Sequence, residues 1–205
     1  QLAGIDGVQF VGICDLVEAR AKKSEAAVVK FGHTPKLYVG DENAWRKMLD
    51  ETKPDAVFIA TPWSTHAIMA ITSMKAGAHA FVEVPMAVTL QEMWEIVDTS
   101  EATGRHCMML ENVNYGREEL LYLNMVRQGV LGELLHGEAS YLHTLRFQME
   151  NGDSTGSWRT FEYAKRNGNL YPTHGLGPVA QYMNLARGED NFGRISSFST
   201  PARGR

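Results

Sequence analysis

Short apolar runs alternate with longer amphipathic runs through the first half of the chain. The apolar runs are rich in β-branched and aromatic residues, which favour strands, and the longer runs have helical periodicity. The expected strands are residues 8–14, 37–39, 55–61, 78–84 and 106–112. The expected helices are residues 18–31, 41–51, 64–77 and 89–104. Nearly all-apolar strands separated by helices predict an α/β fold with a parallel sheet covered on both faces.

Several of these boundaries carry capping signals. Ser64 is a candidate N-cap for the third helix, and Gly77 marks its end. Thr89 and Glu92 have the spacing of a capping box at the start of the fourth helix. These signals strengthen the alternating assignment.

The carboxyl ends of the strands are where such sheets bind ligands. The ends expected here are Asp15, residues 61–63, Glu83–Val84 and Glu111–Asn112. An acid in the position of Asp15 holds the adenosine ribose in dinucleotide folds, although an acid that caps the next helix is at least as good an explanation. No G-x-G-x-x-G loop precedes Asp15. We therefore expect a Rossmann-like sheet whose first strand and Gly-rich loop are missing.

Glu83 is the one charged residue in the stretch "AFVEVPMAV" at 80–88. We expect its side chain to be nearly buried at the end of a strand, and a buried carboxylate is costly unless it has partners. The hydroxyls of a nicotinamide ribose would be such partners. This interpretation puts Glu83 on the cofactor side of a site.

The pattern changes after Tyr115. A helix is expected at 116–128, a long strand at 132–148, a Gly- and Ser-rich loop at 149–158, a turn entering a helix within 166–188, and a last strand at 194–200. These elements predict part of an α+β domain. We accordingly place a partial cofactor-binding domain at residues 1–114 and a partial substrate domain at 115–205.

Composition narrows the function classes. The 205 residues are 44% hydrophobic with a formal net charge of −4, so the chain is globular and has no basic surface to bind nucleic acid. No apolar run has the length of a membrane span. The histidines lack the spacing to each other and to acids that a metal site requires, so we expect no metal.

Residues 55–85 carry a specific resemblance. "TPWSTH" after one strand and "EVP" after the next are similar to the oxidoreductase family of glucose–fructose oxidoreductase and inositol dehydrogenase (the Gfo/Idh/MocA fold family), whose dehydrogenases have E-K-P at the second place. In those dehydrogenases the lysine polarises the substrate hydroxyl. Val84 replaces that lysine here, which argues against simple dehydrogenation.

Residues 106–138 and 168–189 closely resemble glycoside hydrolase family 109, whose members are NAD-dependent glycosidases known for α-N-acetylgalactosaminidase activity and carry E-V-P. The resemblance covers nearly the whole chain, and it implies a sequence truncated at both ends and inactive by itself. It implies NAD as cofactor and a glycoside, with terminal N-acetylgalactosamine, as substrate. A homo-oligomer stays open, as do a bacterial cytoplasmic location and, with an upstream signal peptide, a periplasmic or secreted one.

The resemblance also implies roles for individual residues. The catalytic candidates are His174 and Tyr171. The substrate contacts are Tyr141, Arg159, Tyr171, Pro172, Thr173 and His174. The cofactor contacts are Asp15, Trp63, Ser64, Thr65, His66, Glu83, Val84 and Asn112. Taken without the resemblance, Tyr171 and His174 would be an ordinary turn and helix start, Arg159 a solvated charge, and Tyr141 and Trp63 packing residues.

The chemistry that the resemblance implies is hydrolysis without net redox. Oxidation at sugar C3 acidifies the C2 hydrogen, a base removes it, the C1 substituent leaves, water adds, and reduction restores C3. Histidine suits the proton transfer because it ionises near neutral pH. Two alternatives stay open: an NAD(P)-dependent sugar or inositol dehydrogenase, and a non-catalytic fragment of such an enzyme.

Overall fold

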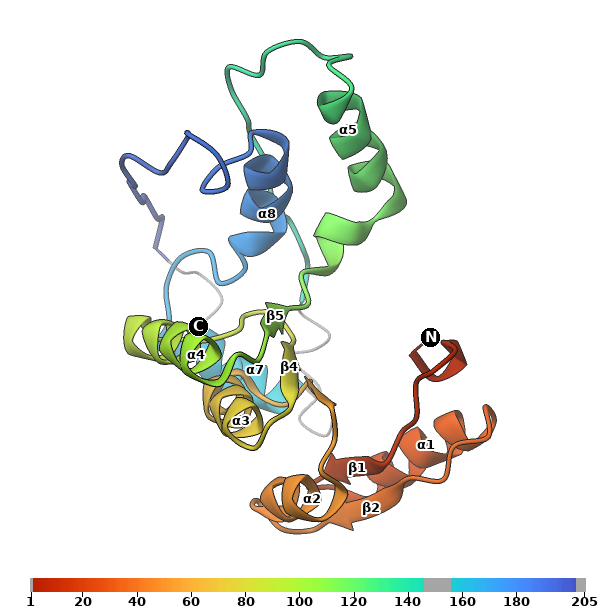
Figure 1. Ribbon diagram of the computed structural model, residues 1–205. Helices are drawn as coiled ribbons and strands as arrows, with labels where there is room; N and C mark the ends of the chain where they lie inside the picture. Colours follow the sequence, from red (N-terminus) through yellow and green to blue (C-terminus); the bar gives the residue numbers. More distant parts are fainter. Residues whose placement is uncertain (1, 146–155, 202–205) are drawn as a thin grey trace. The chain divides into compact units, whose positions relative to one another are not determined.

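The computed structural model describes residues 2–145 and 156–201, with the elements labelled in Figure 1. The strands are β1 (Gly12–Asp15), β2 (Lys36–Val39), β3 (Ala56–Ile59), β4 (His79–Val82) and β5 (Cys107–Met109). The helices are α1 (Glu18–Val29), α2 (Ala44–Thr52), α3 (Trp63–Lys75), α4 (Leu90–Thr103), α5 (Arg117–Arg127), α7 (Gly156–Lys165) and α8 (Thr173–Tyr182). Two 3₁₀ helices are η1 (Leu2–Gly4) and η2 (Asn112–Tyr115).

The strands form two sheets in the orders β1-β2 and β3-β4-β5. The pairs β1–β2 and β3–β4 are parallel, with Gly12 opposite Lys36 and Ala56 opposite His79. A doubly wound sheet has the order 3-2-1-4-5-6, and removing its first strand leaves 3-2 and 4-5-6 as separate groups. The two observed sheets have this arrangement. The expected Rossmann-like α/β fold, without its first strand, is therefore confirmed.

Helix packing and capping follow the sequence closely in this part of the chain. Helices α1 and α2 both pack on β1 and β2. The capping box is present, because Thr89 Oγ1 accepts a hydrogen bond from Glu92 N–H and the Glu92 carboxylate accepts one from Thr89 N–H. The N-cap prediction for Ser64 is wrong: Thr65 N–H donates to the Pro62 carbonyl, so the first turn of α3 begins before Ser64.

The described residues group into two compact units. The first holds all of β1 to β4 and helices α1, α2 and α4. The second holds the helices from α5 onward together with two short segments that follow strands β3 and β4. The first unit is residues 1–59, 67–82 and 89–108, and the second is residues 60–66, 83–88 and 109–205.

The second unit is more helical than expected. Helix α5 is where the sequence predicts it, and α8 lies within the expected 166–188 segment and packs against both α5 and η2 (Figure 1). The strand predictions at 132–148 and 194–200 are wrong for the residues described, 132–145 and 194–200, which have no regular structure. A strand needs a neighbour to complete its hydrogen-bond ladder. Neither segment has one in the described part of the second unit.

None of the described helices combines the length and the apolar character of a membrane-spanning segment.

Candidate functional site

An aromatic cluster forms the centre of the second unit. Its buried members are Trp63, Val84 and Tyr171, which are 2%, 7% and 7% exposed. Trp63 lies at the start of α3 and Tyr171 two residues before α8, so packing joins segments distant in sequence. The partly buried hydrophobic side chains packed against them are Val88, Met109, Tyr141, Trp158, Tyr163 and Leu170.

Trp63 is the hub of this cluster. Its ring contacts Trp158 edge-on at 5.1 Å between centroids, Tyr171 edge-on at 5.3 Å, and Tyr163 in a tilted arrangement at 6.1 Å. Edge-to-face aromatic pairs are favourable beyond their burial of area. Helix α7 supplies Trp158 and Tyr163. The sequence pattern predicts a loop at Trp158 and no regular element at Tyr163, so this helix is not predicted. The signal that could have found α7 is the i,i+4 pair of Glu162 with Arg166, which forms an ion pair.

Four of the predicted substrate residues lie together around Tyr171. Its ring stacks on His174 at 5.3 Å and 12°, and Tyr141 packs against both rings at 5.6 and 4.8 Å. Arg159 Nε lies 3.4 Å from the Tyr171 hydroxyl, and its guanidinium lies over Trp158 at 4.5 Å. These four side chains thus bring two phenols, a guanidinium and an imidazole together in one cluster.

The other two predicted substrate residues belong to the start of α8. Pro172 is the exposed residue immediately before the helix, and Thr173 is its first residue. The buried hydroxyl of Thr173 has no hydrogen-bond partner among the described residues. Both stay predictions as substrate contacts.

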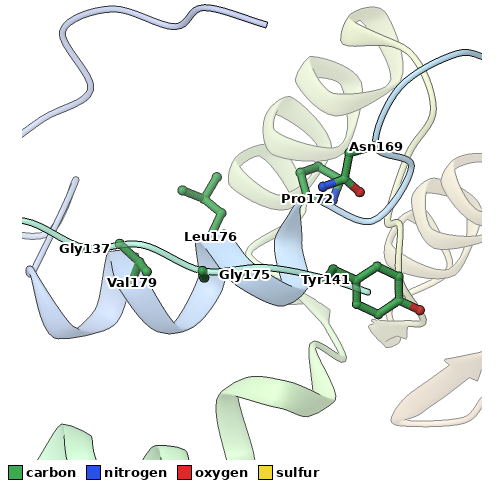
Figure 2. Close-up of a pocket in the computed structure, with 8 residues that line it drawn as sticks. Gly137, Tyr141, Asn169, Pro172, Gly175, Leu176 and Val179 are labelled. Carbon is green, nitrogen blue, oxygen red and sulfur yellow. The ribbon is translucent and has the colours of Figure 1, made fainter. Parts of the chain in front are cut away.

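Two glycines bring Tyr141 beside α8. A Cβ on Gly137 would lie 2.7 Å from Val179 Cγ1, and one on Gly175 would lie 3.0 Å from Ala139 Cβ, so larger residues would push the 137–141 segment away. Figure 2 shows this segment running along α8, with Tyr141 at one end of a pocket and Val179 near the other. The pocket has a volume of about 300 Å³ and is lined by Gly137, Ala139, Tyr141, Asn169, Pro172, Gly175, Leu176 and Val179.

The buried acid of this site is Glu111, two residues after β5. It is 1% exposed, and its Oε1 lies 2.6 Å from His174 Nδ1. The same oxygen accepts a hydrogen bond from Val113 N–H at 3.1 Å. The sequence pattern places Glu111 at the end of an expected strand and indicates no role for it. The structure joins it directly to the predicted catalytic histidine.

The expectation that Glu83 is nearly buried is wrong. β4 ends at Val82, so Glu83 lies beyond the strand and its side chain is exposed, while Val84 turns back into the aromatic cluster. No ribose is needed to explain a solvated carboxylate. Its contact with the cofactor stays a prediction.

The predicted cofactor residues at the start of α3 differ in burial, since some are exposed to solvent and others are packed inside the second unit. Ser64 is exposed. Thr65 Oγ1 lies 2.7 Å from Thr61 Oγ1, and His66 is 1% exposed with its ring nitrogens each 2.7 Å from a backbone carbonyl, those of Thr61 and Pro85. His66 therefore ties the two short segments of the second unit together. Its ring nitrogens are already occupied.

Two further cofactor predictions lie elsewhere. Asn112 is exposed at the first position of η2. Asp15 is half-buried at the end of β1 in the first unit, and its Oδ1 accepts a hydrogen bond from Val17 N–H at 2.8 Å. A carboxylate that ends a parallel strand just before a helix fits the ribose hydroxyls of a dinucleotide. Asp15 is thus compatible with binding the adenosine ribose of NAD.

Burial raises the pKa of the Tyr163 phenol to about 12, and the neighbouring phenols of Tyr171 and Tyr141 add to the shift. Burial also raises the pKa of Tyr141, followed by the effect of Tyr171. Both phenols are therefore neutral at physiological pH and can donate hydrogen bonds. Their neutrality suits contact with an uncharged sugar.

The raised pKa of Tyr163 predicts a loss of stability in alkali. A pKa above the ordinary phenol value of about 10 means that the folded state holds this proton more tightly than the unfolded state. The resulting stabilisation is complete below about pH 10 and is lost as the pH rises toward the folded value. Denaturation of the full-length protein across this range should show the loss, and Tyr163→Phe should reduce it. Tyr122→Phe, which changes an exposed tyrosine of α5, should not, and an equal effect of the two would contradict the assignment.

Comparison with known protein families accounts for almost the whole chain. Residues 2–111 match the oxidoreductase family with an NAD-binding Rossmann fold, and residues 115–205 match the C-terminal domain of glycosyl hydrolase 109. The expected cofactor, NAD, is confirmed at the level of this fold.

Curated relatives give the same result. The chain is 61% identical to glycosyl hydrolase family 109 protein 1 of Akkermansia muciniphila, over 100% of this chain and 43% of the relative. It is 56% identical to a glycosyl hydrolase family 109 protein of Shewanella sp. strain W3-18-1, over 100% of this chain and 45% of the relative. The chain thus spans less than half the length of these relatives.

Solved structures show the same fold. Myo-inositol 2-dehydrogenase from Lactobacillus plantarum superposes with a TM-score of 0.70 at 19% identity, over 89% of this chain and 51% of that one. The WlbA dehydrogenase from Bordetella pertussis, in complex with NADH and UDP-GlcNAcA, gives a TM-score of 0.50 at 26% identity, over 61% of this chain and 34% of that one. Fold, family models and relatives agree: the chain belongs to glycosyl hydrolase family 109, within the oxidoreductase family with an NAD-binding Rossmann fold.

Proposed function

We propose that the full-length protein hydrolyses α-N-acetylgalactosaminides by an oxidation–elimination–addition–reduction route that depends on NAD. The observation that carries the proposal is the position of His174. Its side chain is 13% exposed, and it packs against two tyrosines, one of which contacts Arg159. A proton-transfer group therefore lies beside side chains able to hold a sugar.

The family supports hydrolysis, and the site favours elimination over displacement. Most glycosidases act through two carboxylates that flank the glycosidic bond. Among the described residues, Glu111 is the carboxylate in hydrogen-bond contact with this cluster, and it is buried against His174. Such a carboxylate is poorly placed to attack a sugar carbon or protonate a leaving group, whereas an imidazole can remove a C–H proton once it is acidified.

In this proposal, NAD⁺ would supply reversible hydride transfer at sugar C3 when it is bound. A carbonyl at C3 makes the C2 hydrogen acidic, and the His174 imidazole takes that proton as the C1 substituent leaves. Water then adds across the C1–C2 double bond, with its oxygen on C1 and a proton returned to C2. Return of the hydride and of a proton to the C3 carbonyl restores the C3 hydroxyl, so that no redox change remains. Every bond broken on the sugar except the glycosidic one is thus restored.

The other side chains hold and orient the reactants. Tyr141 and Tyr171 would pack on the sugar ring or donate hydrogen bonds to its hydroxyls, and Arg159 would bind the N-acetyl oxygen. Pro172 and Thr173 fix the entry to α8 that carries His174. The residues proposed to contact the cofactor are Asp15 in the first unit and, in the second unit, Trp63, Ser64, Thr65, His66, Glu83, Val84 and Asn112.

The NAD and sugar assignment has support from a relative of the fold. The WlbA dehydrogenase, at 26% identity, was solved with NADH and UDP-GlcNAcA together. Binding of NADH together with a sugar nucleotide is thus compatible with this architecture. The replacement of lysine by Val84 distinguishes the present chain from the dehydrogenases that use E-K-P.

The test is turnover of an aryl α-N-acetylgalactosaminide by the full-length protein supplied with NAD⁺. The proposal predicts release of the phenol without accumulation of NADH. A dehydrogenase would instead form one NADH for each sugar oxidised and would release no phenol. Phenol release that is unchanged after complete removal of NAD would contradict the proposal.

A further inference from the structure

Glu111 is a buried carboxylate with one specific ionisable partner. Its side chain is 2% exposed, and its Oε1 lies 2.6 Å from His174 Nδ1. Its Oε2 is buried and has no hydrogen-bond partner within the described residues. Burying a carboxylate is unfavourable unless it is paired, so the His174 contact accounts for its presence here.

The hydrogen bonds of Glu111 indicate the direction of this contact. Oε1 also accepts the Val113 N–H at 3.1 Å, as expected for a carboxylate oxygen. A carboxylate oxygen accepts hydrogen bonds and an imidazole N–H donates them, so the contact has the geometry of a proton on His174 Nδ1 shared with Glu111. In a neutral imidazole the other nitrogen, Nε2, then carries the free lone pair. The pair therefore selects the tautomer in which Nε2 is the basic atom.

The ring is also fixed in orientation. Tyr171 stacks on its face with an interplanar angle of 12°, and Tyr141 packs against it with centroids 4.8 Å apart. Glu111 is held at the start of η2, where its carboxylate caps the 3₁₀ helix through Val113. Rotation of the imidazole would break the Glu111 contact and disturb both aromatic contacts. Among the described residues, Nε2 makes no hydrogen bond that would compete with a substrate.

We propose that Glu111 is a positioning residue that holds His174 in the Nδ1–H tautomer, with Nε2 as the acceptor of the sugar C2 proton. This inference rests on the function proposed above, which assigns the proton transfer to His174. Glu111 itself contacts neither sugar nor cofactor in the proposal. Its contribution passes through the imidazole, in the way that a buried carboxylate orients a histidine base in other enzymes.

The first experiment is a double-mutant cycle in the full-length protein with Glu111→Gln, His174→Ala and both together. Glu111→Gln keeps the shape but can donate to Nδ1 and so favours the wrong tautomer. We expect kcat to fall by about 10²–10⁴-fold, the range for loss of proton-transfer catalysis, while KM and the affinity for NAD stay near wild type. In the His174→Ala background the same change should cost nothing further, because Glu111 would have no imidazole to orient.

The matched control is Glu118→Gln, which removes an equal charge from an exposed position in the first turn of α5. It should leave kcat unchanged. A structural role for Glu111 would predict a different pattern: weaker NAD binding or lower stability, and an equal loss of activity in both backgrounds. That pattern would overturn the inference.

The second experiment reads the tautomer directly. With ¹⁵N-labelled histidine, the His174 signals are identified by their disappearance in His174→Ala. We expect a protonated Nδ1 and an unprotonated Nε2 in the wild type, and a shift of the proton toward Nε2 in Glu111→Gln. A wild type with the proton on Nε2 would overturn the inference.

The two proposals fail in distinguishable ways. If wild-type protein hydrolyses the glycoside without NAD, the proposed function fails whatever the tautomer of His174. If wild-type activity requires NAD and Glu111→Gln keeps normal kcat, the function stands and the positioning role of Glu111 is wrong.

Discussion

Replacing His174 with alanine should lower kcat by about 10²–10⁴-fold, the usual cost of removing a proton-transfer group. Binding of NAD should change little, because His174 contacts Glu111 and two tyrosines in the second unit. Turnover of an aryl glycoside and titration with NAD would measure the two effects separately. Normal turnover in this variant would contradict a role of His174 in proton transfer and leave it a structural residue at the start of α8.

Glu83→Ala is the matched comparison for His174→Ala. Glu83 is exposed just after β4 and is proposed to face the cofactor, so its loss should weaken NAD binding more than it affects proton transfer. Because the side chain is solvated, its removal should not destabilise the fold. If His174→Ala lost NAD binding and Glu83→Ala kept it, the assignment of His174 to the substrate and of Glu83 to the cofactor would be wrong.

Replacing Trp63 with alanine should give the largest loss of stability in the second unit. The ring is 2% exposed and touches Trp158, Tyr163 and Tyr171. Truncating such a core tryptophan costs about 3–5 kcal/mol, since it removes buried area and leaves a cavity. Urea denaturation of the full-length protein, followed by near-ultraviolet circular dichroism, would report the loss.

Trp94→Ala is the control for this effect. Trp94 lies on α4 and is 61% exposed, so its truncation should change the free energy of unfolding by no more than about 0.5 kcal/mol. If Trp63→Ala were as mild as Trp94→Ala, Trp63 would not be the centre of a packed cluster. Trp63 would then contribute little to stability, and contact with the cofactor would be its main role.

The sequence predicted the first half of the fold well because its signals are local. Apolar runs, a capping box and the acid at the end of β1 each depend on a few neighbouring residues. The separation of the strands into two sheets also agrees with the missing first strand, since that strand occupies the centre of the 3-2-1-4-5-6 order. Strand pairing in the second unit is not local. The alternation at 132–145 therefore predicted a strand for which the described residues offer no neighbour.

The candidate site was predicted in its parts but not in its connections. The resemblance supplied Tyr141, Arg159, Tyr171 and His174, and the structure brings these side chains together. The sequence could not identify which acid is buried. A shift of two residues in the end of a strand decides whether the side chain of a carboxylate is buried or exposed to solvent. Glu83 was expected inside and is exposed, whereas Glu111 is buried.

Helix α7 shows why composition misleads near a site. Gly156 and Ser157 favour a loop, and the sequence around them predicts one. The helix is nonetheless favoured by tertiary packing, since Trp158 and Tyr163 both reach Trp63. Tertiary contacts of this kind override local propensity and are not visible in a window of sequence.

The fate of the C2 hydrogen is the most direct test of the central claim, elimination through a C3 ketone. The full-length enzyme should be allowed to hydrolyse an aryl α-N-acetylgalactosaminide in deuterated water, and the released sugar analysed by NMR. Removal of the C2 proton and its return from a group in contact with solvent predict deuterium at C2 of the product. Complete retention of hydrogen at C2, with normal turnover, would contradict the mechanism.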